Sequence, residues 1–315
     1  MSQSDSQSGS PSDSPSGSFS GGQSHGLFVG LTTLDCLYQA DHSPQADEKV
    51  VANKSLLVAG GPATNAAVAF AQLGCSRGNR ATLLSVIGAH PLTTVITEDL
   101  RGQGVTLADL EADRPSPPPV SSIVVTDATG ERAVIARNAT DLQADADQLS
   151  PDILSGVTVV LIDGHQMVVG AQIAQWANAQ SIPVVVDAGS WKPNFDSVLS
   201  VADVVVASAN FLPPQCSTPQ EVFAYLASLN VSKMAITRGA NSILYADGDE
   251  RGEVEVPQIR AVDTLGAGDI FHGAFCHFYA THTFEETLLK ASRSASFACQ
   301  YWGTRDWTKI YRIVD

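Results

Sequence analysis

Short and nearly continuous runs of apolar residues alternate with longer stretches of helical periodicity from about residue 25 onward. Runs of this kind are typical of strands that are buried on both faces of a sheet. Strands that alternate with helices favour βα units, so the pattern predicts an α/β fold with a central, mostly parallel sheet. Five segments are predicted to be its strands: 82–87, 157–162, 183–186, 203–207 and 234–237.

The stretches between these strands carry helix signals. Thr218 and Glu221 form a capping-box pattern with proline at the first helical position, and apolar residues follow at helical spacing. A helix of small residues is expected over 66–73 and is predicted to end in a left-handed cap at Gly74. In the segment 269–279, apolar residues line one broad face, which predicts a deeply buried helix.

Two partly polar stretches, about 34–58 and 105–138, interrupt this alternation. Within the second, β-branched runs at 121–126 and 132–136 flank a turn with its tip at 128–130, which predicts a hairpin. The two stretches are expected to form a small separate sheet that acts as a lid over the main domain. Ordinary surface loops and an edge hairpin are the alternative. A lid with an exposed apolar face would allow a homodimer through the lids.

Residues 1–24 contain mainly Ser, Gly, Pro, Gln and Asp, which is typical of a disordered tail, so the folded domain is expected over 25–315. The tail has no basic or continuous apolar segment and resembles neither a secretory signal nor a transit peptide. Nowhere does an apolar run approach the roughly 18 residues of a membrane span. Five cysteines, an odd number without a CxxC pair, fit a reduced, cytoplasmic protein.

The formal net charge of −15 argues against binding to nucleic acid or to an anionic membrane. An anionic ligand must therefore be held locally, by helix N-termini, backbone N–H groups and a few Arg or Lys side chains. His272, His277 and His282 are five residues apart and do not share one helix face, so no metal site is expected from them.

A glycine-rich turn stands directly before the most apolar predicted helix: residues 263–269 read DTLGAGD. Glycines allow unusual backbone torsions and let another group approach the main chain closely. The first N–H groups of the helix lack internal partners and lie at the positive end of its dipole, which favours an anion there. Asp269 is then either a helix cap or a base that accepts a proton from a hydroxyl while those N–H groups hold a phosphoryl group.

Four motifs in this chain resemble those of the ribokinase-like carbohydrate kinases, also called the phosphofructokinase B family. The C-terminal motif covers 263–275, and the N-terminal motif is GGPATNAA at 60–67, followed by Leu-Gly at 73–74. The segment 30–35 resembles the first strand of the family with its sugar-binding aspartate, and 236–239 resembles the turn on the nucleotide side. The order and spacing agree over about residues 25–310.

The resemblance implies a three-layer ribokinase-like fold with a small β lid. It also implies an ATP-dependent kinase that phosphorylates a hydroxymethyl group of a ketose, pentose or related polyol. Asp269 is then the catalytic base, and the backbone of Gly266, Ala267 and Gly268 is the anion hole. Asp35, Gly61 and Asn65 bind the sugar, while Thr237, Gly239 and Thr264 bind the nucleotide. Magnesium arrives with ATP, and Asp263 marks the position of a monovalent cation such as K⁺.

Three further residues follow strands or end the expected lid. Arg137 and His165 are candidates for substrate contact, and Lys192 is a candidate for phosphate contact, although turns and surface ion pairs explain them equally well. The chain also departs from the family: Pro213 replaces a glutamate that usually follows an asparagine, here Asn210, so the metal arrangement stays open.

A second departure leaves ribose open as the substrate, because Pro62 follows the glycine pair where several sugar kinases carry a polar residue. Two alternatives remain: a nucleoside kinase of the same fold, and a sugar-binding sensor without catalysis. A phosphorylated sugar is less favoured because the acidic chain offers few basic residues near the expected pocket.

Overall fold

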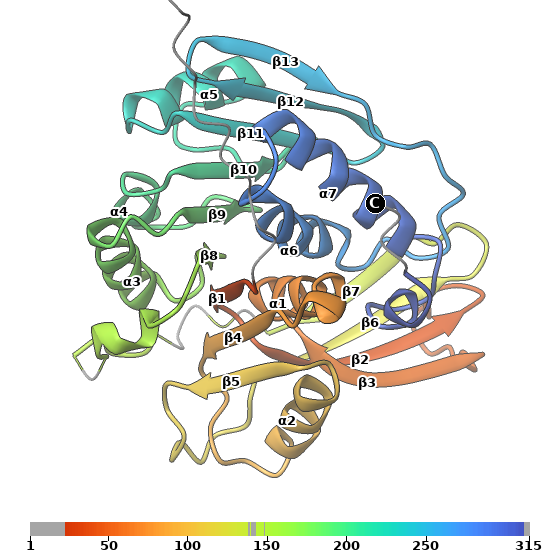
Figure 1. The fold of residues 1–315 in the computed structure, drawn as a ribbon. Coiled ribbons are helices and arrows are strands. Elements are labelled where there is room, and N and C mark those ends of the chain that lie inside the picture. The colour runs from red at the N-terminus through yellow and green to blue at the C-terminus, as the bar shows by residue number, and fades with distance from the viewer. Residues whose placement is uncertain (1–22, 138, 140–142, 148, 312–315) are drawn as a thin grey trace, which may run out of the picture.

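A large twisted sheet of nine strands crosses the centre of the structure (Figure 1). The structure is a computed structural model that describes residues 23–137, 139, 143–147 and 149–311. Of the predicted tail 1–24, residues 1–22 lie outside the described residues. In spatial order the strands are β13 (Glu250–Val254), β12 (Asn241–Asp247), β11 (Lys233–Arg238), β10 (Val204–Ser208), β9 (Val184–Ala188), β8 (Val159–Ile162), β1 (His25–Val29), β4 (Arg80–Ser85) and β5 (Val105–Asp109).

Seven of these strands, from β11 to β5, run parallel to their neighbours, and only β12 and β13 are antiparallel. Each of the five predicted strands overlaps one of the parallel strands. Because the parallel strands share one direction, their carboxyl ends meet at a single edge of the sheet, where ligands of such folds usually bind.

Helices cover both faces of this sheet, so the predicted three-layer fold is confirmed. Side chains alternate along β1: Phe28 belongs to one hydrophobic core, while Leu27 and Val29 belong to the other. The first core is closed by α1 (Pro62–Leu73), α2 (Thr93–Gly102), α6 (Ala267–Tyr279) and α7 (Phe284–Ala298). The second core is closed by α3 (Met167–Ala179), α4 (Asp196–Leu199) and α5 (Pro219–Ser228). Each described helix is too short or too polar to cross a lipid bilayer.

The predicted cap of α5 is confirmed, and the predicted left-handed cap of α1 is wrong. The hydroxyl of Thr218 accepts a hydrogen bond from the Glu221 amide, and the Glu221 carboxylate accepts one from the Thr218 amide. Gly74, by contrast, has φ −97°, because the chain continues directly into a short 3₁₀ turn at Cys75–Arg77. The left-handed residue is Gly78, with φ 74°, at the end of that turn.

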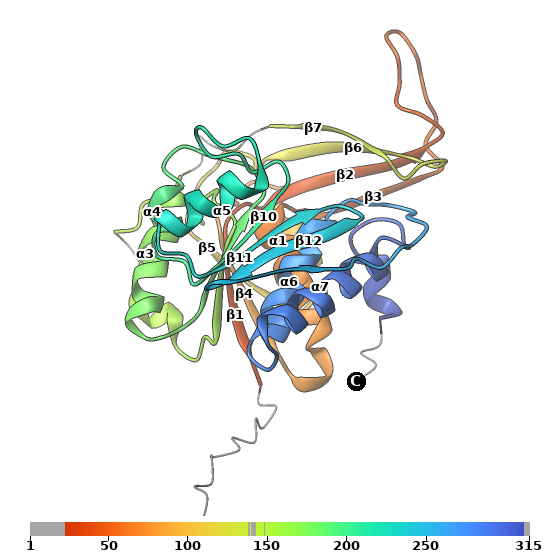
Figure 2. The same cartoon turned by 90° about the horizontal axis from the view of Figure 1, so that it is seen from above.

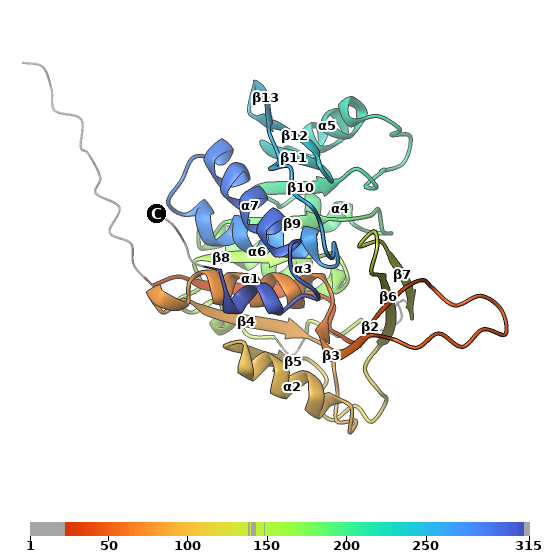
Figure 3. The ribbon, with the colours of Figure 1, turned by 90° about the vertical axis from the view of Figure 1, so that its right-hand side faces the viewer.

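A separate four-stranded sheet lies beside the large sheet at its carboxyl edge, as Figures 2 and 3 show. Its order is β3 (Lys54–Gly60), β2 (Thr33–Ala40), β6 (Val120–Thr126) and β7 (Arg132–Ala136). The expected hairpin is therefore present, with Gly130 at its tip in a left-handed conformation of φ 67°. The expected segment 105–138 divides, however, because Val105–Asp109 pairs with β4 as the edge strand of the large sheet.

The small sheet has its own apolar core. Leu37, Val58, Ile123 and Val125 of its inner face pack on Trp302, and Leu265 lies against the same cluster. This packing places the inner face of the small sheet over the turn that precedes α6.

One buried histidine predicts how stability depends on pH. His277, near the end of α6, is almost fully buried, and burial lowers its pKa to about 4 from an ordinary value of 6.5. The unfolded chain therefore binds a proton between pH 6.5 and 4 that the folded chain does not bind. The stabilisation is complete above pH 6.5 and is lost as the pH falls through this window, by about 3 kcal/mol.

Urea unfolding of wild type and His277→Gln between pH 7 and pH 4 measures this contribution. We expect the variant to lose less stability over the window than wild type, while His42→Gln, at an exposed position, follows wild type. Equal pH dependence in wild type and His277→Gln would contradict the assignment.

Candidate active site

The start of α6 presents backbone N–H groups at the carboxyl edge of the large sheet. Gly266, the N-cap, has φ 70° and ψ 9°, a left-handed conformation that glycine adopts without strain. A Cβ at Gly268 would have no described heavy atom within 4 Å, so the backbone there borders open space. The rest of the helix is buried from Ile270 to Phe278, which fixes this end in place. Gly266 thus precedes the helix, Ala267 and Gly268 are its first two residues, and the Ala267 amide donates a hydrogen bond of 3.3 Å to the Thr264 carbonyl oxygen.

Asp269 lies in the first turn of α6, and its carboxylate is held by α1. Oδ2 accepts a hydrogen bond of 2.9 Å from Nδ2 of Asn65. Among the described residues, Oδ1 has no hydrogen-bond partner. Burial raises the pKa of Asp269 to about 6, and the nearby carboxylate of Asp187 adds to the rise. At neutral pH the group is therefore a carboxylate that accepts a proton more readily than an ordinary aspartate.

Two buried carboxylates, Asp187 and Asp163, lie near enough to Asp269 for their charges to act on it. Asp187 is the last residue but one of β9, and burial raises its pKa, although His272 opposes the rise. The Nδ1 atom of His272 lies 2.7 Å from the Gly268 carbonyl oxygen and 3.4 Å from Oδ2 of Asp187. Nε2 lies 3.2 Å from the Val206 carbonyl oxygen, so His272 ties the first turn of α6 to β9 and β10.

Asp163, directly after β8, joins the loop after β1, the start of α1 and the loop after β8. It accepts hydrogen bonds from the amides of Leu31, Ala63 and His165. Burial acts to raise its pKa, but the charge and hydrogen bond of His165, the hydrogen bond from the Leu31 amide and the charge of Lys192 together hold the pKa below its usual value. The His165 ring is bound to Asp163 at 3.1 Å, and the charge of Lys192 acts on both Asp163 and Asp187. The predicted residues His165 and Lys192 therefore lie around this cluster.

Asp35 lies on β2 of the small sheet and faces the glycine pair. Burial raises its pKa, while hydrogen bonds from Thr33 and Ser121 oppose the rise. A Cβ at Gly60 would overlap the Asp35 carboxylate, so only glycine leaves room for it. Gly61 has φ 101°, and a Cβ there would overlap the Leu31 carbonyl oxygen. The predicted sugar-binding residues Asp35 and Gly61 are thus brought together with the start of α1.

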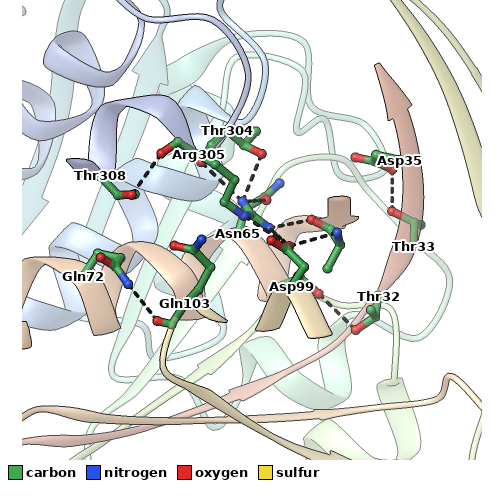
Figure 4. Close-up of polar contacts among 12 residues, drawn as sticks. Thr32, Thr33, Asp35, Asn65, Gln72, Asp99, Gln103, Thr304, Arg305 and Thr308 are labelled. Carbon is green, nitrogen blue, oxygen red and sulfur yellow. Dashed lines mark hydrogen bonds and ion pairs between the residues drawn. The ribbon is translucent and has the colours of Figure 1, made fainter. Parts of the chain in front are cut away.

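Asn65 joins this group to a buried arginine that the sequence analysis missed (Figure 4). Its Oδ1 accepts a hydrogen bond of 3.1 Å from Nη1 of Arg305, and Arg305 forms an ion pair of 3.0 Å with Asp99. Arg305 is 6% exposed. No periodic pattern marks Arg305 or Asp99; an arginine within the aromatic C-terminal segment is the one signal that the sequence offers.

The predicted nucleotide-side residues occupy the far part of the same edge. Thr237 is the last residue but one of β11, which lies two strands away from β9. Gly239 turns the chain into β12 with φ 63° and open space around it. Thr264 precedes the glycine turn and accepts hydrogen bonds of 3.0 Å at both O and Oγ1 from Arg132 of β7, another residue that the sequence analysis missed.

Asp263 acts as a clamp between two loops. Its carboxylate oxygens accept hydrogen bonds of 2.9 Å from the amides of Leu265 and Gly303. Its side chain is therefore engaged with the backbone. Within the described ranges, no group of three or more His, Cys, Asp or Glu side chains gathers to hold a metal ion.

Arg137 directly follows β7. It lines a cavity of about 550 Å³ with His90, Arg114 and three consecutive prolines, and neither Asp35 nor Asp269 lines that cavity. Asn210 is exposed, and its amide binds the Ser208 hydroxyl after β10.

Comparison with known proteins decides the family. The pfkB family of carbohydrate kinases matches residues 25–309, nearly the whole described chain. The chain belongs to this family. The predicted enzyme class, an ATP-dependent carbohydrate kinase, is thereby confirmed at the level of the family.

Two curated relatives and one solved structure illustrate the similarity. The chain is 26% identical to the ribokinase of Bacillus subtilis over 287 residues, which covers 88% of this chain and 93% of the relative. It is 23% identical to the deoxyribokinase of Salmonella typhi over 290 residues, with coverage of 88% and 93%. The structure of Arabidopsis thaliana ribokinase with ribose and ATP superposes with a TM-score of 0.72 at 21% identity, covers 90% of this chain and 94% of that chain, and shows the same fold.

Two substitutions in the glycine turn of this pfkB-family protein are expected to differ in their effect on thermal stability. Gly266→Ala forces a side chain into a left-handed conformation and places its Cβ 2.9 Å from Cγ2 of Thr304, which we expect to cost about 1–2 kcal/mol. The unfolding temperature then falls by roughly 2–6 °C. Gly268→Ala enters open space within a helix and leaves the unfolding temperature unchanged or raised. Calorimetry of both variants checks this, and equal losses would contradict it.

Proposed function

We propose that this chain transfers the γ-phosphoryl group of ATP to a hydroxymethyl group of a sugar. The observation that carries the proposal is the position of Asp269, one residue after the open glycine turn and held at one oxygen by Asn65. A substrate hydroxyl near Oδ1 gives its proton to Asp269, while the amides around Ala267 hold the phosphoryl group. Because the pKa of Asp269 lies near 6, the carboxylate is ready to accept that proton at neutral pH.

The residues of this edge fit a nucleotide triphosphate. The N-terminal turn of α6 offers a cradle without side chains at Gly266 and Gly268, and the left-handed Gly239 leaves the backbone open on the nucleotide side. ATP would supply the γ-phosphoryl group, and the Mg²⁺ that accompanies ATP would offset the negative charge of the phosphates. Thr237, Gly239, Thr264 and Lys192 are the proposed contacts to the nucleotide.

The sugar side is built from polar groups that suit a neutral polyol. Asp35 accepts hydrogen bonds from hydroxyls, the second N–H of Asn65 donates one, and Gly61 allows close approach to the backbone. His165 and Arg137 are the outer candidates for substrate contact. The similarity to ribokinase and deoxyribokinase supports a pentose as the substrate.

A monovalent cation such as K⁺ is proposed near Asp263. The carboxylate of Asp263 holds residues 263–265 and Gly303 together by accepting a hydrogen bond from the Leu265 amide and one from the Gly303 amide. The cation then stabilises the turn that leads into the anion hole, and the Asp263 side chain supports the loops without being a direct ligand.

The small sheet is proposed to act as the lid and as a dimer contact. Its hairpin touches the loop before the anion hole at two points, since Arg132 binds Thr264 and a Cβ at Gly130 would lie 2.9 Å from the Val262 carbonyl oxygen. Its outer face carries Leu57, 54% exposed, and Ile135, 79% exposed, in one row across the four strands. The loop 41–53 extends past this sheet in Figures 2 and 3.

The activity is tested by ADP release with ATP and a panel of ribose, deoxyribose, fructose and adenosine. We expect turnover with a pentose, and we expect Asp269→Asn to lower it roughly 10²–10⁴-fold without changing the unfolding temperature. Asp306→Asn, at an exposed position near the site, serves as the control. Full activity in Asp269→Asn would contradict its role, turnover with adenosine alone would identify a nucleoside kinase, and binding of sugar without turnover would identify a sensor.

The dimer is tested by analytical ultracentrifugation at micromolar concentration. We expect a dimer for wild type and a monomer for Ile135→Glu, because a buried charge at the centre of an apolar contact is costly. Val168→Glu places the same charge at an exposed valine on α3, away from the small sheet, and leaves the dimer intact. A monomeric wild type rules out this contact.

A further inference from the structure

The guanidinium of Arg305 is buried and hydrogen-bonded through all three of its nitrogens (Figure 4). Nε and Nη2 donate to Oδ2 of Asp99 at 3.3 and 3.0 Å, and Nη2 also donates to the Ala59 carbonyl oxygen at 2.6 Å. Nη1 donates to Oγ1 of Thr304 at 2.9 Å and to Oδ1 of Asn65 at 3.1 Å. Such a network holds the guanidinium in one orientation, because its planar fork must match every acceptor.

Asp99 neutralises this buried charge and fixes its place in the fold. Besides the two bonds from Arg305, Oδ2 of Asp99 accepts a hydrogen bond of 3.0 Å from the Ala59 amide. Asp99 belongs to α2 and Ala59 to β3, while Arg305 follows α7. The ion pair therefore joins three elements directly beside the start of α1, where Asn65 lies.

The chemistry of the two neighbours leaves one orientation for the Asn65 amide. Arginine only donates hydrogen bonds, so the oxygen of the amide must face Arg305. An ionised carboxylate only accepts them, so the nitrogen must face Asp269. The observed contacts, 3.1 Å from Nη1 to Oδ1 and 2.9 Å from Nδ2 to Oδ2, agree with this orientation.

We propose that Arg305, held by Asp99, is a positioning residue of the phosphoryl-transfer site. It fixes the Asn65 amide, and Asn65 in turn holds Oδ2 of Asp269, so that Oδ1 faces the substrate hydroxyl. The last step rests on the proposed function, whereas the orientation of Asn65 and Asp269 does not. Arg305 contacts neither substrate nor phosphate in this proposal.

The loss of Arg305 is expected to change the pKa of Asp269, which depends on the charged and polar groups around it. Asp187 of β9 and Asp163 after β8 raise the pKa of Asp269, while His272 of α6 and the hydrogen bond from Asn65 lower it. When Arg305 no longer fixes the amide, the Asn65 hydrogen bond weakens and the pKa of Asp269 rises. The loss of one such bond corresponds to about half a pH unit or more.

Arg305→Lys tests the proposal, because lysine keeps the positive charge beside Asp99 but lacks the fork that reaches Asn65. With the best substrate of the panel, we expect kcat to fall roughly 10–100-fold, as for a small displacement of a reacting group. The acid limb of kcat/KM shifts to higher pH. The ¹³Cγ resonance of Asp269, assigned with Asp269→Asn, titrates at the same higher pH without any substrate.

Two further variants separate positioning from general damage. Asn65→Ala in the Arg305→Lys background is expected to add little to the shift of the Asp269 titration without substrate, because both changes remove the same hydrogen bond to Asp269. If Arg305→Lys does not fold, Arg305→Met with Asp99→Leu removes both charges together, which buried pairs tolerate better, and is expected to show the same titration. Asp306→Asn, next in the chain and exposed, matches wild type.

The outcomes distinguish the two proposals. A wild type without turnover on the panel contradicts the proposed function, and the titration of Asp269 alone then decides the role of Arg305. An active wild type with unchanged kcat and unchanged Asp269 titration in Arg305→Lys overturns the positioning role. Fully additive shifts of the substrate-free Asp269 titration in Arg305→Lys and Asn65→Ala overturn it as well, as does an equal defect in Asp306→Asn.

Discussion

The close contact between α1 and α6 is the constraint on which the site depends. Gly273 carries no side chain where the two helices meet, and a Cβ there would overlap the Ala66 carbonyl oxygen and lie 2.7 Å from Cβ of Ala69. Because the helices are this close, Asn65 and Asp269 near their N-terminal ends are joined by a hydrogen bond. Both N-termini therefore open onto the same space at the carboxyl edge of the sheet.

Burial of carboxylates at this edge gives the site its electrostatic character. Asp163, Asp187 and Asp269 lie close enough that their charges act on one another, and burial raises the pKa of Asp269 to about 6. Ordered donors offset the accumulated negative charge: backbone amides around Asp163, and the imidazole of His272 beside Asp187. These donors are engaged by the carboxylates, which leaves the amides at the start of α6 as the groups proposed to hold an anion.

Much of the fold follows from short-range patterns. The apolar runs predicted the parallel strands because those strands are buried on both faces, and Thr218 with Glu221 predicted the cap of α5 because a capping box is a local structure. The prediction of a left-handed cap at Gly74 was wrong because a glycine after a helix fits both such a cap and an entry into a 3₁₀ turn. The segment 105–109 was placed in the lid because its pairing with β4 depends on a distant strand.

The sequence by itself determined the glycine turn, its aspartate and the family, because these rest on residues that are neighbours in the chain. Only the tertiary structure decided that Asn65 bridges Asp269 and Arg305, that Asp99 neutralises Arg305, and that Arg132 reaches Thr264. These contacts join residues up to 240 positions apart. No local pattern encodes them, because each depends on how whole helices and strands pack.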